Sequence, residues 1–149
     1  MTKLERCACA NECHSVGLNC AQSLLTAFCD VTGLTEEQSA VLCGGFGGGM
    51  RYGGVCGVVS AAVMVLGTVC PATRATGAEG KRRAGELTME FERRFKERFG
   101  NLDCHALKAN PVGEGTEMAN TLQASNHCRM LIISGTELLH DMLTELEEK

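Results

Sequence analysis

Apolar residues recur at intervals of three and four along most of this chain, which is the spacing of α-helices. The clearest case is residues 55–69, which contain no charge and no proline and consist mostly of small apolar side chains. Within this segment Cys56, Val59, Val63 and Leu66 fall on one face. The pattern predicts a helix that is buried on all sides.

Two later segments have the pattern of amphipathic helices. Residues 81–99 are rich in charge, and their apolar positions repeat every four residues, at Leu87, Phe91, Phe95 and Phe99. Residues 128–146 have an apolar stripe made of Cys128, Ile132, Gly135, Leu139, Met142 and Leu146. Each stripe predicts a helix that faces the core along one side.

The first third of the chain predicts further helices. A stripe of apolar residues runs through residues 12–28, and Thr35 and Gln38 have the spacing of a capping box that opens a short helix. Few segments alternate as strands do. We therefore expect an all-α fold, a compact single-domain bundle of five to seven helices over residues 1–149, with residues 1–12 as a candidate loose, cysteine-rich segment.

Composition narrows the function classes. The formal charge is −4 with a pI of about 5.6, and only 4% of residues are aromatic, so neither a basic patch nor a stacking platform for nucleic acid is evident. The start lacks the apolar core of a signal peptide, and no apolar run reaches the roughly 20 residues of a membrane span. We expect a cytoplasmic protein, and the high apolar content is compatible with a homodimer.

Ten cysteines in 149 residues are the unusual feature. In a reducing compartment they favour thiol chemistry, metal binding or simple burial over a disulfide framework. Cys56 follows a run of seven glycines between residues 44 and 54 and begins the apolar helix. Cys104 and Cys128 also fall at predicted helix starts, where a thiol ionises more readily, and Cys20 is predicted to face the core from mid-helix.

Other cysteine patterns are less informative. Cys7, Cys9 and Cys13 are clustered, but their spacing matches no common zinc or ferredoxin site, so the cluster is either a metal site or a group of partly exposed thiols. Three histidines adjoin cysteines in the sequence, although neighbours on a helix point about 100° apart. No Cys-x-x-Cys pair occurs, which argues against a thioredoxin-type dithiol and excludes covalent c-type haem.

The arrangement of four dispersed cysteines resembles the C_GCAxxG_C_C family of redox-active proteins. The resemblance rests on Asn19-Cys20-Ala21-Gln22, on Cys56-Gly57 after the glycine-rich bend, and on the single cysteines Cys104 and Cys128. It implies that the family's four cysteines correspond to Cys20, Cys56, Cys104 and Cys128. The motif is imperfect, because Val55, Gly57 and Ser60 stand where the family name has Gly, Ala and Gly.

Three functions remain open at this point. The four cysteines can hold an iron–sulfur cluster for electron transfer, with zinc as an alternative metal and with Gly54 and Gly57 contributing backbone groups near the cofactor. They can instead act as a metal-free thiol–disulfide oxidoreductase in which Cys56 attacks. The third interpretation is a helical binding module with packed cysteines. An oxidoreductase or electron carrier needs a redox partner that the sequence does not identify.

Overall fold

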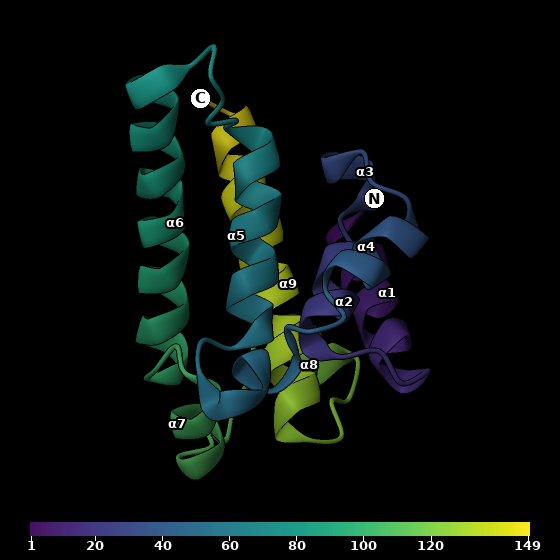
Figure 1. The fold of residues 1–149 in the computed structure, drawn as a ribbon. Coiled ribbons are helices and arrows are strands. Elements are labelled where there is room, and N and C mark those ends of the chain that lie inside the picture. Colours follow the sequence, from purple (N-terminus) through teal and green to yellow (C-terminus); the bar gives the residue numbers. More distant parts are fainter.

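The computed structural model describes residues 1–149, and the chain is helical almost throughout (Figure 1). The only extended pairing is a single antiparallel bridge between Val55 and Asp103. Ten helical segments follow one another, of which six are seven residues or longer. They are α1 (Lys3–Ser15), α2 (Cys20–Thr26), α3 (Cys29–Thr32), α4 (Glu36–Leu42), η1 (Gly49–Gly53), α5 (Gly57–Val69), α6 (Gly77–Phe99), α7 (Cys104–Ala109), α8 (Glu117–Thr121) and α9 (His127–Glu147). The all-α expectation is confirmed.

The long helices α5, α6 and α9 form one half of the bundle (Figure 1). Helix α5 packs against both α6 and α9, and α2 packs against α5 from the other side. Helix α1 covers α2 and α9, and α4 covers α2. The short segments η1, α7 and α8 lie together at the lower end of the view, where α5 begins. That end of the bundle therefore collects segments far apart in the sequence.

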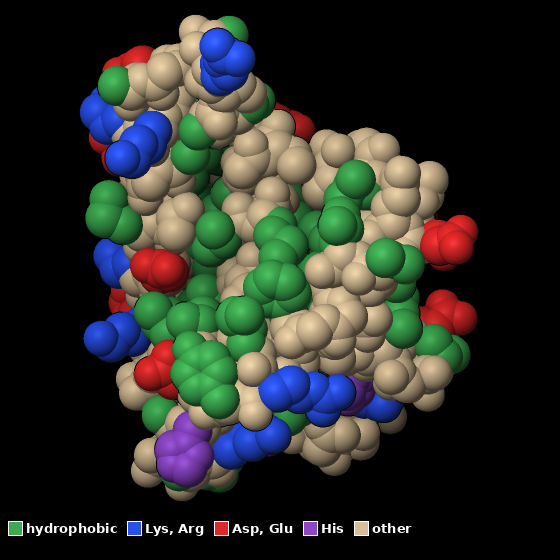
Figure 2. Space-filling model, viewed as in Figure 1, with side chains coloured by type: hydrophobic (Ala, Val, Ile, Leu, Met, Phe, Trp, Pro, Cys, Tyr) green, Lys and Arg blue, Asp and Glu red, His purple; other side chains and the backbone are tan.

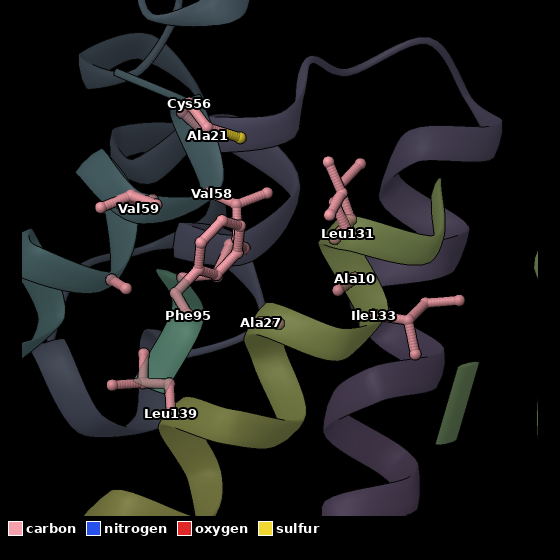
Figure 3. Close-up of a cluster of buried hydrophobic side chains, with 14 of the residues drawn as sticks. Ala10, Ala21, Ala27, Cys56, Val58, Val59, Phe95, Leu131, Ile133 and Leu139 are labelled. Carbon is pink, nitrogen blue, oxygen red and sulfur yellow. The ribbon is translucent and has the colours of Figure 1, made fainter. Parts of the chain in front are cut away.

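The core forms where these helices meet (Figure 3). Helix α5 supplies much of this core, with Val58, Val59 and Leu66 at most 1% exposed. The prediction that this helix is buried on all sides is wrong, because its last three residues, Gly67, Thr68 and Val69, are exposed. The phenylalanines at residues 91, 95 and 99 of α6 are buried against α5 and α9, and Phe95 and Phe99 lie with ring centroids 4.8 Å apart. At about 25 cal/mol for each Å² of apolar surface buried, this central cluster is the main stabilising term.

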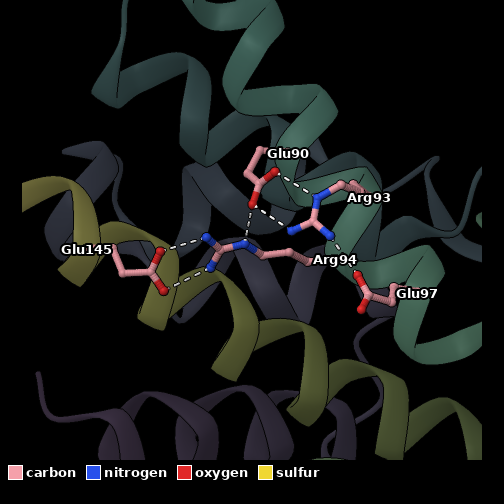
Figure 4. Close-up of polar contacts among 5 residues, drawn as sticks. All are labelled: Glu90, Arg93, Arg94, Glu97 and Glu145. Carbon is pink, nitrogen blue, oxygen red and sulfur yellow. Dashed lines mark hydrogen bonds and ion pairs between the residues drawn. The ribbon is translucent and has the colours of Figure 1, made fainter.

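The side of α6 that faces away from the core has charged, solvent-exposed side chains, which lie along the left edge of the face shown in Figure 2. Glu90 bonds to both Arg93 and Arg94, and Arg94 continues to Glu145 on α9 at 2.6 Å (Figure 4). Exposed pairs of this kind contribute about 0–1 kcal/mol each, so the network orients α6 against α9 more than it stabilises the fold. Apolar side chains occupy the middle of the same face.

The high apolar content of the sequence is compatible with a homodimer. That association stays a prediction.

The sequence-based boundaries are wrong near the N-terminus. The predicted helix over residues 12–28 is interrupted at Gly17, whose φ of +100° no helix accommodates. Helix α2 then begins at Cys20, where the Asn19 side chain accepts from the Gln22 N–H and Gln22 bonds back to the Asn19 N–H. Cys20 is therefore a helix-initiating residue and not a mid-helix one.

The N-terminal segment is a helix and is not loose. Thr2 and Glu5 form a capping box at the start of α1. The Arg6 guanidinium, only 5% exposed, donates to both carboxylate oxygens of Asp30 at 2.7 and 2.9 Å and to the Ala27 carbonyl, and it lies over the Phe28 ring. These contacts fix α1 against the segment that joins α2 and α3.

No helix of this chain is both long enough and apolar enough to cross a membrane.

Candidate functional site

Four cysteines line one small cavity of about 60 Å³ at the lower end of the bundle. Besides Cys20, Cys56, Cys104 and Cys128, its lining consists of Gly48, Val58, Leu107, Lys108 and Leu131. The four cysteines come from the starts of four different helices, α2, α5, α7 and α9. Residues spread over more than one hundred positions of sequence are thus brought to one place, and most of the other residues lining the cavity are apolar.

Cys20 is the cysteine with the strongest surrounding of hydrogen-bond donors. The Cys56 thiol, followed by the backbone N–H groups of Ala21, Gly48 and Gly57, lowers the pKa of Cys20 to about 6 despite its burial. Donors that point at a sulfur stabilise its negative form, so these surroundings favour the thiolate form of Cys20. The capping box of Asn19 and Gln22 holds this residue in place.

The pKa of Cys56 is shifted in the opposite direction to that of Cys20. It occupies the N-cap position of α5 and is only 5% exposed. Its hydrogen bond to Cys20, together with burial, raises its pKa well above the usual range. This direction runs against the expectation that the helix start makes Cys56 the readily ionised thiol, because burial and the neighbouring Cys20 sulfur oppose the effect of the helix start. Which cysteine of the pair reacts stays a prediction.

A short piece of paired backbone brings Cys104 next to Cys56. The Cys56 N–H donates to the Leu102 carbonyl at 2.8 Å, and the Cys104 N–H donates to the Gly54 carbonyl at 2.7 Å. These bonds flank the bridge between Val55 and Asp103. Cys104 is then the first residue of α7, as the sequence predicts, although the Asp103 side chain makes no capping bond.

Cys128 reaches the cavity from the first turn of α9. The helix starts at His127, after Asn126 accepts from the Arg129 N–H at 2.9 Å. Burial raises the pKa of the Cys128 thiol, and the nearby Lys108 ammonium partly offsets that effect. The sequence did not single out Lys108, although it is the only charged side chain in the cavity lining.

A left-handed turn closes one side of the cavity. Gly48, Gly49, Met50 and Arg51 all have positive φ, between 56° and 66°. Such a conformation costs a residue with a side chain roughly 1–2 kcal/mol. The turn aims the Gly48 N–H at the Cys20 sulfur. The run of glycines signals an unusual backbone, but nothing in the sequence singles out Gly48.

Of the two glycines predicted to lie near a cofactor, Gly57 lies against the Cys20 sulfur and Gly54 lies outside the cavity. A Cβ on Gly57 would lie 2.5 Å from the Cys20 sulfur, so only glycine lets the start of α5 approach Cys20 this closely. Gly54 does not line the cavity. It accepts from Cys104 and donates to the Gly49 carbonyl at 3.0 Å, so it positions the site instead of touching its contents.

Several predicted partners do not reach this cavity. No histidine lines it, so the histidines adjoining Cys104 and Cys128 are not paired with the sulfurs there. Cys7 and Cys43 are buried in the core, and the other cysteines lie outside the cavity. No disulfide is formed, and no three His, Cys, Asp or Glu side chains are close enough to hold one metal ion.

Comparison with known protein families identifies a match. A sequence model of the family described as "Putative redox-active protein (C_GCAxxG_C_C)" matches residues 18–142. The chain belongs to the C_GCAxxG_C_C family. The matched region includes all four cysteines of the cavity and excludes α1 with Cys7, Cys9 and Cys13. No curated protein and no solved structure matches the chain.

Membership of the C_GCAxxG_C_C family agrees with the resemblance noted from the sequence. The coarse interpretation, a cysteine-rich protein of a family described as redox-active, rests on this match. The reaction, the cofactor and the role of each cysteine are matters for proposal.

Proposed function

We propose that this protein is a thiol-based redox protein in which Cys20 and Cys56 are the reacting pair. The observation that carries the proposal is that Cys20 and Cys56 line one small cavity with two further cysteines, where the start of α5 approaches the Cys20 sulfur closely. The neighbouring thiol and backbone donors lower the pKa of Cys20, whereas the Cys20 sulfur and burial raise the pKa of Cys56, which favours a thiolate beside a thiol. A thiolate beside a thiol is the arrangement that thiol–disulfide exchange requires.

Exposure assigns the two roles. Cys20 is partly exposed, whereas Cys56 is buried, so Cys20 meets an incoming disulfide first. The Cys20 thiolate attacks one sulfur of that disulfide, the substrate's S–S bond breaks, and the first substrate thiolate leaves and takes a proton from solvent. Cys56 then loses its proton and attacks Cys20, which releases the second substrate thiol. Two electrons and two protons pass to the substrate, and a Cys20–Cys56 disulfide remains.

A limiting amount of oxidised glutathione provides the test. We expect native alkylation and peptide mass spectrometry to find a Cys20–Cys56 disulfide before any other. Cys56→Ser should trap a mixed disulfide on Cys20, because the resolving thiol is missing, while Cys20→Ser should form neither species. Cys70→Ser, which removes a partly exposed cysteine outside the cavity, is the matched control. First oxidation at another cysteine pair would contradict the proposal.

An iron–sulfur cluster is the second candidate, and the number of cysteines favours it. A dithiol needs two sulfurs, whereas the cavity has four. A single zinc ion does not fit the thiols as they lie, because no three are close enough to share one ion. A cluster spreads its thiolates over several irons and fits this donor set better. Cys20, Cys56, Cys104 and Cys128 would hold it, and it would supply one-electron transfer.

Anaerobic purification separates the two candidates. If the cluster is present, iron and acid-labile sulfide should copurify with the protein, and Cys104→Ser and Cys128→Ser should lose both. The dithiol reaction requires neither of those residues, so under the first proposal both variants keep the Cys20–Cys56 disulfide. Stoichiometric iron and sulfide in the purified protein would replace the first proposal with the second.

A further inference from the structure

A second pair of cysteines lies in a pocket of its own, away from the four-cysteine cavity. The pocket has a volume of about 470 Å³ and is formed by α1, α2 and α4 together with the loop between α1 and α2. Cys9 and Cys13 line it, as do three glutamates, Glu12, Glu36 and Glu37. None of its lining residues belongs to the four-cysteine cavity.

The two thiols lie one turn apart on α1 and line the same pocket. Both are partly exposed, and each shifts the pKa of the other. Residues four apart on a helix have Cβ atoms about 5–6 Å apart, whereas a relaxed disulfide needs about 3.5–4.5 Å. The pair therefore cannot close a disulfide without opening the helix. A metal ion bound between the two sulfurs requires no S–S bond, so it can link them while the helix stays intact.

The surroundings of the pair favour a cation. The carboxylates of Glu12 and Glu36 lie close enough to oppose negative charge on both sulfurs. Neither carboxylate, nor that of Glu37, takes part in an ion pair. The nearby Arg6 is already engaged by Asp30. The pocket thus has excess negative charge that no side chain neutralises.

A buried polar atom in the same pocket also lacks a partner. Thr26 is only 6% exposed and lines the pocket, yet its hydroxyl oxygen makes no hydrogen bond. Buried hydroxyls are nearly always bonded, so Thr26 leaves one unsatisfied polar atom beside the pocket. It belongs to α2, whereas the cysteines belong to α1, and it is not a ligand of the site proposed below.

We propose that Cys9 and Cys13 bind a monovalent soft metal ion, Cu(I), as a two-coordinate bis-thiolate. Thiolates are the ligands that Cu(I) prefers, and two are sufficient for it. Zinc normally takes four ligands, and no third donor is close enough here. On binding, two S–H bonds are replaced by two S–Cu bonds and two protons are released. The site lies outside the family match to residues 18–142 and does not depend on the proposed redox function.

Anaerobic titration of the reduced full-length protein with Cu(I), in competition with bicinchoninate, tests the proposal. The comparison is between Cys9→Ser/Cys13→Ser and the control Cys29→Ser/Cys70→Ser, each of which loses two partly exposed thiols. We expect the first variant to bind one equivalent of Cu(I) less than wild type, while the control binds as much as wild type. Wild type and both variants keep the four-cysteine cavity, so copper bound there contributes equally to each and cancels when their copper contents are compared.

Residue-level alkylation of the wild-type protein gives a second readout that needs no variant to fold. Cu(I) added until the four-cysteine cavity is also filled should slow alkylation of both Cys9 and Cys13 by about tenfold or more, since a metal-bound thiolate is no longer a free nucleophile. Unchanged alkylation of these two residues, or equal copper binding by the Cys9→Ser/Cys13→Ser variant, would overturn the proposal. Equal protection by Zn(II) would also overturn it, because that ion needs further ligands.

Discussion

The Cys20 sulfur is stabilised by backbone groups and one neighbouring thiol, without a positively charged side chain among the main contributors. Its reactivity should therefore depend on backbone geometry more than on salt, since fixed N–H dipoles at close range are screened little. This feature separates Cys20 from the other cysteines of the cavity, of which Cys56 and Cys128 have raised pKa values. It also makes two predictions at the scale of single residues.

The first prediction concerns pH. Only the thiolate reacts with iodoacetamide, so alkylation of Cys20 should fall as the pH drops through about 6 and stay nearly flat above pH 7. An ordinary thiol would instead gain about tenfold in rate per pH unit until about pH 8.5. Cys56→Ala removes the main donor and should move the Cys20 midpoint upward. A Cys20 profile that rises steadily to pH 8.5 in wild type would contradict this assignment.

The second prediction concerns Gly57. In Gly57→Ala the new Cβ would meet the Cys20 sulfur at 2.5 Å and the Phe46 carbonyl at 3.0 Å. We expect a loss of about 1–3 kcal/mol in the free energy of unfolding and a raised Cys20 pKa, because the sulfur must move from its donors. Denaturant unfolding and the alkylation profile measure the two effects.

Gly67→Ala is the matched control for that substitution. Gly67 lies in the same helix, and a Cβ added there would have no other atom within 4 Å. Alanine there should stabilise α5 by about 0.5–1 kcal/mol, because glycine is a poor helix former. Equal destabilisation by both substitutions would show that α5 resists any added methyl group and that contact with Cys20 is not the cause.

At the scale of elements, the site depends on how closely α5 and α9 approach. Gly135 of α9 faces Val58 of α5, and a Cβ on Gly135 would lie 2.2 Å from a Val58 methyl carbon. Val58 also lines the four-cysteine cavity. The crossing of these two helices therefore sets the distance between the segments that begin near Cys56 and Cys128.

A double-mutant cycle tests this crossing. Gly135→Ala should destabilise the protein by about 1–3 kcal/mol, because Val58 is fixed in its rotamer by the helix and cannot turn away. Val58→Ala removes the clashing methyl groups, so the double variant should lose less stability than the sum of the two single variants. Additive losses, measured by denaturant unfolding, would show that the two residues do not limit the approach of α5 to α9.

The sequence predicted the long elements better than their ends. Residues 55–69, 81–99 and 128–146 have apolar periodicity over several turns, and each is helical. The break at Gly17 was missed because the apolar stripe continues on the same face beyond it, although Asn19 and Gln22 have the spacing of a capping box. Local capping chemistry outweighed periodicity there.

The sequence identified which cysteines form the site, but it did not predict their pKa shifts. Family resemblance identified the four cysteines, and their positions at or next to helix starts explain how they converge. Sequence could not show that the pKa of Cys20 is lowered and that of Cys56 raised, because these directions depend on burial and on which sulfur receives the backbone donors. The left-handed turn was also out of reach, since Met50 and Arg51 rarely adopt positive φ.

At the scale of the whole molecule, the four-cysteine cavity is completed by the last long helix. Cys20, Cys56 and Cys104 are made first on the ribosome, and Cys128 and Leu131 of α9 close the remaining wall. Domains generally fold as units, and α9 packs against α1, α2, α5 and α6. The cavity therefore forms only when the last long helix is in place, so a chain that ends before α9 would keep three of the four cysteines and lose the site that unites them.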